Sequence, residues 1–330
     1  MEYQIEQINE EIFTKNIETI DYDKYRDYEA INQSLLKDLY FSPEKVGIEK
    51  DTKGIKLGSI VDAIVFNTFE DEYIICDVQV PTGTIKDIIE ALWIEGLDFT
   101  DDNIVNKVRE FGWHDNWGKD TVVNKVREGV KSSKTAGNKY FTFLNRSDGK
   151  TVVNEEDYNE AYLLADHFKR NYRNEYKDSE YQNAYVGDLK FKNNDMTNSV
   201  FKIKGLMDME DDDFIYDMKV IGQDPRSFGY NYFLKYRYDI QALQYYLFKG
   251  KKMIFLLLST KYPNLTIKRS ITNHQLIRAI SGFTYNNRYY PGYKDLIKNY
   301  YRQYINDFVE YPIYVKEQNY INYEYEHIEN

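Results

Sequence analysis

Asp208, Asp217 and Lys219 are the residues of this chain whose types and spacing could carry out chemistry. Carboxylates supply the hard oxygen ligands that Mg²⁺ prefers. Opposed carboxylates on neighbouring strands destabilise each other unless a cation lies between them. Two aspartates around a metal ion, with a lysine beside them, would suit the metal-assisted hydrolysis of a phosphodiester. The alternative is a solvated salt-bridge ladder on an exposed hairpin, because acid-x-Lys patterns recur elsewhere in this acidic chain.

The sequence around these residues predicts a β-hairpin that would bring them together. Two apolar-rich runs flank an acidic, turn-prone stretch. A turn centred on residues 212–213 would put Asp208 about opposite Asp217, at a distance of ~5 Å across the strands. Lys219 stands two residues beyond Asp217, so both side chains point to the same face, ~7 Å apart along the strand. Two carboxylates and one ammonium would then share one patch.

The segment after the hairpin predicts a helix followed by a buried strand. Residues 228–248 carry apolar side chains at helical spacing, and residues 253–258 form a continuous apolar run. Arg237, Gln241 and Tyr245 follow one another at intervals of four residues. That spacing puts the three side chains on one side of the helix.

Taken in order, these segments resemble the PD-(D/E)xK nuclease superfamily, and within it the phage-recombination branch of lambda-exonuclease-like and exodeoxyribonuclease-VIII-like enzymes. That branch has a G-x-(I/L/M)-D motif, a hairpin with D-x-K, and a helix with Q-x-x-x-Y. The corresponding residues here are 205–208, 217–219 and 241–245. Together these ordered motifs are more specific than the D-x-K triplet alone.

The N-terminal part of the chain supports the same resemblance and also departs from it. Residues 31–37 are similar to the opening helix of the branch, and residues 57–65 resemble its G-x-x-x-H segment. Asp62 stands where many members have histidine; aspartate is the harder ligand and favours Mg²⁺ or Mn²⁺. Met207 replaces the proline that names the superfamily. The resemblance covers most of residues 30–300.

The expected fold is α/β, with a mixed central β-sheet flanked by helices, a restriction-endonuclease-like core and helical insertions. The expected organisation is a polar leader (1–27), one nuclease domain (28–300) with an insertion at about 71–157, and an acidic, aromatic tail (301–330). A helix is predicted at 156–177. The residues on its predicted apolar side are Tyr162, Leu163, Ala165 and Phe168.

The resemblance also implies roles for the site residues. Asp208, Asp217 and the Met218 carbonyl would hold Mg²⁺, with Mn²⁺ as a substitute, and Asp62 would be a further ligand. Lys219 would orient the attacking water and stabilise the charge that develops on the phosphate. Gln241 and Tyr245 would position Lys219 or the substrate phosphate. Alternatives stay open for both: Gln241 could satisfy a buried backbone group, and Tyr245 could belong to the core.

Composition excludes several other classes of protein. The chain has 330 residues, 42% of them hydrophobic, and no apolar run near the ~18 residues that a membrane span needs. The first residues lack the pattern of a secretory signal, so we expect a cytoplasmic protein, in the host cytoplasm if it is phage-encoded. A single cysteine, Cys76, excludes a disulfide framework and a four-cysteine iron–sulfur cluster. The four histidines are scattered, which argues against zinc.

A net charge of −11 is an objection to DNA as a partner, because phosphate backbones attract basic proteins. One stretch of the chain is nevertheless rich in basic residues, and we predict that this stretch contacts the DNA backbone. Its basic residues are Lys119, Lys125, Arg127, Lys131, Lys134 and Lys139. An ordinary solvated face is the alternative. Ser34 and Arg237 are further candidate DNA contacts, although Ser34 also suits the N-cap of a helix.

The sequence therefore predicts a Mg²⁺-dependent DNA exonuclease of phage or prophage recombination or replication. A structure-specific endonuclease on the same fold is one alternative. A catalytically inactive DNA-binding or virion protein is another, from a different functional class. The expected partners are DNA and a phage recombinase or single-strand-annealing protein, with no membrane. The polarity of digestion and the oligomeric state stay open.

Overall fold

The computed structural model describes residues 12–41, 53–113, 116–128, 136–191 and 200–300. The chain forms two compact units. The first comprises Met1–Lys56 and His167–Asn330, and the second comprises Leu57–Asp166. In sequence, the second unit is thus one continuous insertion into the first, and it contains the whole of the predicted insertion at 71–157. The predicted C-terminal tail lies outside the described residues.

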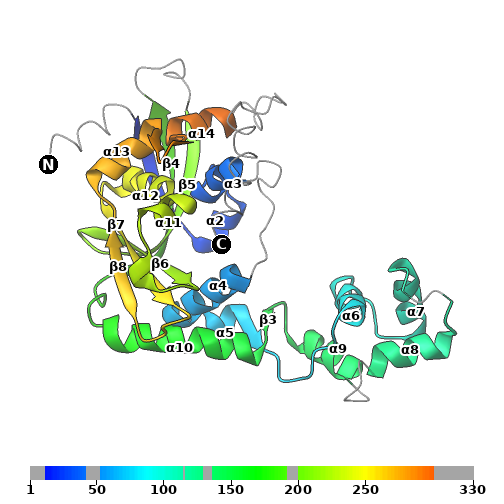
Figure 1. The fold of residues 1–330 in the computed structure, drawn as a ribbon. Coiled ribbons are helices and arrows are strands. Elements are labelled where there is room, and N and C mark those ends of the chain that lie inside the picture. The colour runs from blue at the N-terminus through cyan, green and yellow to red at the C-terminus, as the bar shows by residue number, and fades with distance from the viewer. Residues whose placement is uncertain (1–11, 42–52, 114–115, 129–135, 192–199, 301–330) are drawn as a thin grey trace. The chain divides into compact units, whose positions relative to one another are not determined.

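A six-stranded sheet forms the frame of the first unit, in the order β1-β4-β5-β6-β7-β8 (Figure 1). Its strands are β1 (Ile12–Ile20), β4 (Glu180–Phe191), β5 (Phe201–Glu210), β6 (Phe214–Ile221), β7 (Lys252–Ser259) and β8 (Thr266–Ser270). Neighbouring strands are antiparallel except for β6 and β7, which are parallel. Helices pack against this sheet, so the predicted α/β fold with a mixed central sheet is confirmed.

The parallel pairing of β6 with β7 requires a crossover connection, and the chain makes it with helices. The connection runs through the 3-10 turn η2 (Pro225–Ser227), α11 (Tyr230–Lys235) and α12 (Tyr238–Lys249). The prediction of one helix over 228–248 is therefore wrong. The helix is interrupted at Arg237, whose backbone is left-handed with φ 50°.

α12 is buried along almost its whole length, from Tyr238 to Phe248. It contacts β1, β5 and β7. Leu243 of α12 and Phe255 of β7 are fully buried in the same apolar cluster, where each side chain contributes about 1.5–3 kcal/mol. β7 also confirms the buried strand predicted at 253–258. A helix enclosed in this way must find internal partners for its polar side chains, because unpaired polar groups are costly to bury.

Further helices and a small hairpin complete the first unit. They are α2 (Tyr22–Asp27), α3 (Gln33–Phe41), α13 (Asn273–Ser281), the hairpin β9 (Phe283–Tyr285) and β10 (Arg288–Tyr290), and α14 (Tyr293–Tyr300). α3 contacts α12 and α14, while α2 contacts β4. Gly282 and Gly292 let two backbone segments meet, since a Cβ on Gly292 would lie 2.2 Å from the Gly282 nitrogen. The contacts of α3 with α12 and α14 hold α3 beside α12.

Part of the predicted polar leader, residues 1–27, is built into the sheet. β1 pairs antiparallel with β4, and Ile12 at its start is fully buried. The leader prediction is wrong for this strand because pairing along the edge of the sheet outweighs its polar composition. Most of β1 is exposed, which suits an edge strand.

The second unit is mainly helical. Its elements are part of α4 (Lys53–Phe66), α5 (Phe69–Glu72), β2 (Tyr73–Ile75), α6 (Thr84–Ile94), α7 (Asp101–Glu110), α8 (Lys119–Glu128), α9 (Ala136–Arg146), β3 (Thr151–Val153) and most of α10 (Glu155–Tyr172). α6 to α9 enclose a core that includes Ile88, Leu92, Val108 and Phe143. β2 and β3 form a short parallel pair. Across the described parts of the chain, none of the helices has the length and apolarity to cross a membrane.

α10 confirms a helix here, but it ends at Tyr172, five residues before the predicted end at 177, and its buried face differs from the predicted one. Tyr162 and Leu163 are 45% and 58% exposed. The buried residues are Ala161, Leu164, Ala165 and Phe168. This buried set has the i, i+3, i+4, i+7 spacing of one helix face, whereas Tyr162 and Leu163 lie outside that face.

Candidate active site

The predicted hairpin exists, with the predicted turn. β5 and β6 pair through Met209 with Tyr216 and through Glu210 with Ile215. At the turn, the Asp211 backbone N–H donates to the Phe214 carbonyl at 3.0 Å, and the Asp211 carboxylate accepts from the Phe214 N–H at 2.8 Å. Aspartate stabilises turns in this way by bonding to the backbone that follows it. The turn therefore centres on residues 212–213.

Asp208 stands one residue beyond the last of these pairs, opposite Asp217. Its carboxylate accepts a hydrogen bond from the Met218 N–H at 2.8 Å, where another strand pair would otherwise continue. In a paired strand, the N–H and C=O of one residue face the same neighbour. The Met218 carbonyl is therefore expected to face the side of β6 on which Asp208 lies.

Asp217 is almost fully buried, with 2% of its surface exposed, and it has two partners. Its Oδ2 lies 2.5 Å from the Lys219 Nζ. Its Oδ1 accepts a hydrogen bond from the Gln241 Nε2 at 2.6 Å. Lys219 comes from the same face of β6, as the two-residue spacing predicts, and Gln241 comes from α12. Together the two partners hold the buried carboxylate in one orientation.

A second lysine, Lys37 of α3, lies beside this set. Its Nζ donates to the Gln241 Oε1 at 3.4 Å. The ring of Tyr238 lies under both ammonium groups, 5.3 Å from the Lys37 Nζ and 5.7 Å from the Lys219 Nζ. The site prediction missed Lys37. The one available signal was its place in residues 31–37, the segment that resembles the family's opening helix.

The charges of the site shift one another's pKa. Burial, followed by the neighbouring charge of Asp217, raises the pKa of Asp208 to about 7. Burial, followed by the charge of Lys219, lowers the pKa of Lys37 to about 7. Burial opposes the charged form of Lys219, yet Asp217 and Asp208 raise its pKa above the usual range. At neutral pH, the ionised form of Asp208 is thus poorly compensated, and a cation beside it would favour that form.

The donor set fits a hard divalent cation. Within the described ranges, no three His, Cys, Asp or Glu side chains are grouped so that they could hold a metal ion together. The hairpin offers two carboxylates, Asp208 and Asp217, with the Met218 carbonyl beside them. Mg²⁺ is commonly bound by one or two carboxylates, with water and substrate phosphate completing its coordination. A structural zinc site, by contrast, would need four protein ligands.

Asp208 gives a prediction about stability in the absence of metal. Its folded-state pKa of about 7 exceeds the ordinary 3.8, so the folded protein holds this proton more tightly than the unfolded chain does. The stability linked to that proton is complete below the ordinary pKa and is lost as the pH rises through about 7. In EDTA, Asp208→Asn should therefore raise the Tm at about pH 8, and the gain should shrink towards about pH 5.

Asp211→Asn is the matched control on the same hairpin. Burial opposes ionisation of Asp211, but hydrogen bonds from Tyr216 and from the backbone lower its pKa. This variant should lose stability relative to the wild type as the pH rises from acid to neutral. A thermal-unfolding series in which Asp208→Asn is no more stable than the wild type at about pH 8 would contradict the electrostatics described here.

Gln241 and Tyr245 both lie in the site region, and Tyr245 is buried in the core, as the alternative prediction has it, while a contact of either residue with a substrate phosphate stays a prediction. Gln241 contacts Asp217 and Lys37, not Lys219 or a backbone group. The Tyr245 hydroxyl donates to the Leu206 carbonyl at 2.5 Å, so Tyr245 holds the strand that carries Asp208. Gly205 permits this approach, because a Cβ there would lie 3.0 Å from the Tyr245 ring.

The predicted DNA contact of Arg237 is wrong, and so is the N-cap role that was the alternative for Ser34, whose DNA contact stays a prediction. Arg237 is fully buried and donates hydrogen bonds to Asp239 at 3.0 Å and to the Pro291 carbonyl at 2.7 Å. Its side chain therefore does not reach the surface, where it could contact a DNA backbone. Ser34 is exposed, but it is not the N-cap of α3. Asn32 takes that position, since its Oδ1 accepts from the Leu35 N–H at 2.8 Å.

The predicted basic stretch lies in the second unit, where acidic residues of α7 neutralise part of it. Lys119 pairs with Asp102 and Arg127 pairs with Asp101, both at 2.6 Å. Lys125 is exposed, while Lys131 and Lys134 lie outside the described residues. A DNA contact by this stretch stays a prediction, with less free charge than the sequence indicates.

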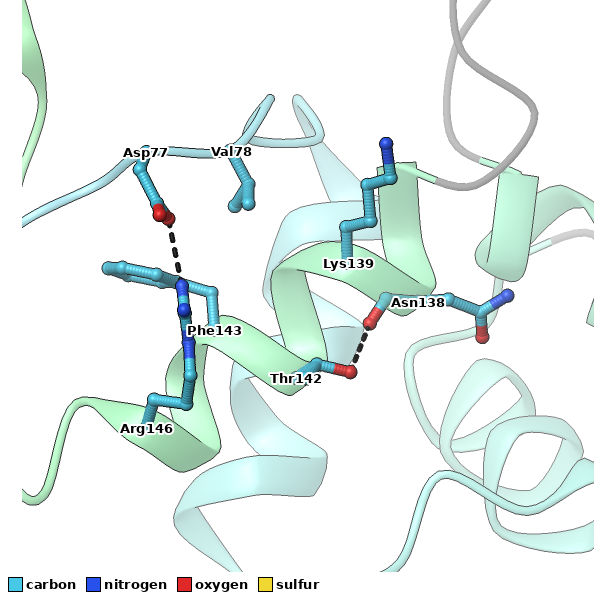
Figure 2. A pocket seen from close by; sticks show the side chains of 7 residues that line it. All are labelled: Asp77, Val78, Asn138, Lys139, Thr142, Phe143 and Arg146. Atoms are coloured by element: carbon cyan, nitrogen blue, oxygen red, sulfur yellow. Dashed lines mark hydrogen bonds and ion pairs between the residues drawn. The ribbon is translucent and has the colours of Figure 1, made fainter.

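The second unit also carries a surface pocket of about 360 Å³ along α9 (Figure 2). Its lining residues are Asp77, Val78, Asn138, Lys139, Thr142, Phe143 and Arg146. Arg146 pairs with Asp77 at 2.9 Å and lies over the Phe143 ring, so Asp77 offsets its positive charge. Asp62 also belongs to this unit, half-buried on α4, and its role as a metal ligand stays a prediction.

Comparisons with known proteins add little to this description. No family model and no curated protein matches the chain. The chain is similar to a solved structure of a "putative exonuclease" from Eubacterium rectale, with 12% identity, a TM-score of 0.41 and coverage of 77% of each chain. A similarity at that level does not establish a shared family or activity. The function therefore has to be inferred from the site residues.

Proposed function

We propose that this chain is a metal-dependent nuclease that hydrolyses phosphodiester bonds in DNA. One observation carries the proposal: Asp208 and Asp217 stand together at the open end of a hairpin, with Lys219 ion-paired to Asp217 and Gln241 fixing its orientation. A salt-bridge ladder on an exposed hairpin, the alternative, would not bury Asp217 to 2% exposure or surround it with two lysines and a glutamine. A buried carboxylate whose pKa is raised by burial and by a neighbouring charge, as for Asp208, is typical of catalytic sites.

Each residue has a defined task in this proposal. Asp208, Asp217 and the Met218 carbonyl would hold Mg²⁺, or Mn²⁺ in its place. Such an ion supplies Lewis-acid polarisation of the phosphate and a water of lowered pKa. Lys219 would place its ammonium against the phosphate oxygens as negative charge develops on them. Gln241 would keep Asp217 oriented, with its own amide held by Lys37.

The finer parts of the proposal follow from the resemblance in sequence. The reaction would be exonucleolytic, in phage or prophage recombination or replication, with a recombinase or single-strand-annealing protein as partner. The net charge of −11 does not preclude a DNA substrate, because bound divalent cations offset carboxylate charge at the site.

The test is incubation of the full chain with end-labelled linear and closed circular duplex DNA, with and without Mg²⁺. Mg²⁺-dependent digestion of the linear substrate alone would support the exonuclease. Cleavage of both substrates would favour the structure-specific endonuclease. DNA binding without cleavage would favour the inactive DNA-binding protein. Asp217→Asn, purified in parallel, controls for a contaminating nuclease and should be inactive.

A further inference from the structure

An exposed aromatic ring lies at the junction between α11 and α12. Tyr236 is 43% exposed. One face of its ring stacks on Tyr238, with 5.5 Å between ring centroids and 24° between planes. Large aromatic side chains are usually well buried, so a stacked ring with much of its surface open offers a face to a planar ligand.

The ring beneath Tyr236 belongs to the candidate active site. Tyr238 is 8% exposed and stacks on Phe255 of β7 at 5.0 Å, which fixes it to the sheet. The same Tyr238 ring lies 5.7 Å from the Lys219 Nζ and 5.3 Å from the Lys37 Nζ. The aromatic stack thus runs from the core, past the lysines of the site, to an exposed ring.

Internal contacts fix the backbone of the junction that carries Tyr236. Arg237 takes a left-handed backbone, which costs roughly 1–2 kcal/mol in a residue other than glycine. Its buried guanidinium offsets that cost by bonding to Asp239 and the Pro291 carbonyl. The Tyr236 N–H also remains bonded to the Tyr232 carbonyl at 3.2 Å. A fixed ring loses little conformational entropy when a ligand stacks on it.

We propose that Tyr236 is a stacking platform for a nucleobase of the substrate strand, close to the scissile phosphate. This inference rests on the proposed nuclease function and adds a binding site for an unpaired base. The ring centroids of Tyr236 and Tyr238 are 5.5 Å apart, and the Lys219 Nζ lies 5.7 Å from the Tyr238 centroid. Because a duplex strand already rises about 3.4 Å per phosphate and an unpaired strand is more extended, this path corresponds to a few nucleotides of the substrate strand.

The chemistry of the surface favours a nucleobase over other planar ligands. Every base has a flat π-face, and stacking on an aromatic side chain does not depend on base identity. The Lys235 Nζ lies over the Tyr236 ring, 5.9 Å from its centroid, so a base that stacks there would also bring its phosphate close to this positive charge. An unpaired base at a strand end would therefore meet both a ring and a cation.

The experiment uses the full chain in EDTA, so that binding is measured without cleavage. The probes are single-stranded oligonucleotides with one 2-aminopurine placed at successive positions from the end. The fluorescence of 2-aminopurine falls when it stacks on an aromatic ring. The wild type should quench one position most strongly, and Tyr236→Phe should do the same. Tyr236→Ala and Tyr236→Leu should lose this quench and bind roughly five- to a hundredfold more weakly, the range expected for one base–aromatic stack.

Tyr181→Ala is the matched control. Tyr181 has the same exposure, 43%, and is aligned with Met209 on β5, so it points to the face of the sheet opposite Asp208. It should quench and bind as the wild type does. Thermal unfolding of each variant checks that the fold is intact, and Tyr236→Leu separates loss of the flat ring from loss of apolar bulk.

The outcomes separate this inference from the proposed function. If the wild type cleaves DNA with Mg²⁺ while Tyr236→Ala quenches and binds like the wild type, the platform is wrong and the nuclease stands. If quenching depends on Tyr236 but no cleavage occurs, the stacking role of Tyr236 is supported, the protein binds nucleic acid without cutting it, and the proposed nuclease activity is wrong. If the wild type neither binds nor cleaves nucleic acid, both are wrong.

Discussion

Lys219→Ala is expected to lower kcat about 10²–10³-fold while KM and DNA affinity change little. An ammonium beside the reacting phosphate stabilises charge that develops in the transition state, and removing one such contact typically costs that factor. Because the interaction strengthens only in the transition state, its loss should appear in kcat. Removing a positive charge next to Asp217 should also leave metal binding intact or tighten it. Single-turnover cleavage and a separate binding titration give the two quantities.

Lys249→Ala controls for the loss of a lysine from a buried ion pair. The Lys249 side chain is 25% exposed, against 24% for Lys219, and its Nζ pairs with the buried Glu210 at 3.1 Å. Both variants remove a partner from a buried carboxylate, which destabilises the fold. Only Lys219→Ala should lower kcat when the two are compared in Mg²⁺ below their unfolding temperatures. Wild-type cleavage by Lys219→Ala would show that the mechanism is wrong, whatever the fold.

Gln241→Leu is expected to weaken metal binding and cleavage by about 10–100-fold, the usual cost of losing a group that orients a metal ligand. The Gln241 amide holds one oxygen of Asp217 and is itself held by Lys37. Leucine fills a similar volume but leaves that oxygen without a donor, so Asp217 would no longer be held in one orientation. Mn²⁺ affinity, measured by titration calorimetry, is the direct readout.

Gln244→Leu is the control for this variant. Gln244 stands three residues further along α12, is fully buried, and donates to the Lys204 carbonyl at 2.7 Å. Its loss leaves a buried carbonyl unpaired, which costs about 1–3 kcal/mol of stability. It should not change Mn²⁺ affinity in the folded protein. If the two variants bind Mn²⁺ equally well, Gln241 is a structural residue and not part of the metal site.

The hairpin was predictable because local sequence determines it. Its turn depends on Asp211 bonding to the backbone that follows, and the two-residue repeat of a strand puts Asp217 and Lys219 on one face. The strand at 253–258 was predictable for a similar reason, as a short apolar run too long for a loop and too short for most helices.

Features that depend on distant contacts were not predictable. The break at Arg237 exists because its side chain reaches Pro291, 54 residues away in sequence, and such a contact outweighs helical periodicity. Residues 12–20 form a strand because β4 offers an edge to pair with, although their composition is polar. Lys37 joins the site through Gln241, 204 residues further along the chain. The spacing of residues along the sequence does not indicate which distant residues come into contact.

The most direct test of the site is the position of a bound metal ion. Crystals of the full chain soaked with Mn²⁺ should show an anomalous peak ~2.0–2.4 Å from carboxylate oxygens of both Asp208 and Asp217. The same crystals of Asp217→Asn should show a weaker peak or none at that position. A strong peak elsewhere with none at the hairpin, or carboxyl groups of Asp208 and Asp217 more than ~8 Å apart in the metal-soaked crystal, would contradict the proposed catalytic centre.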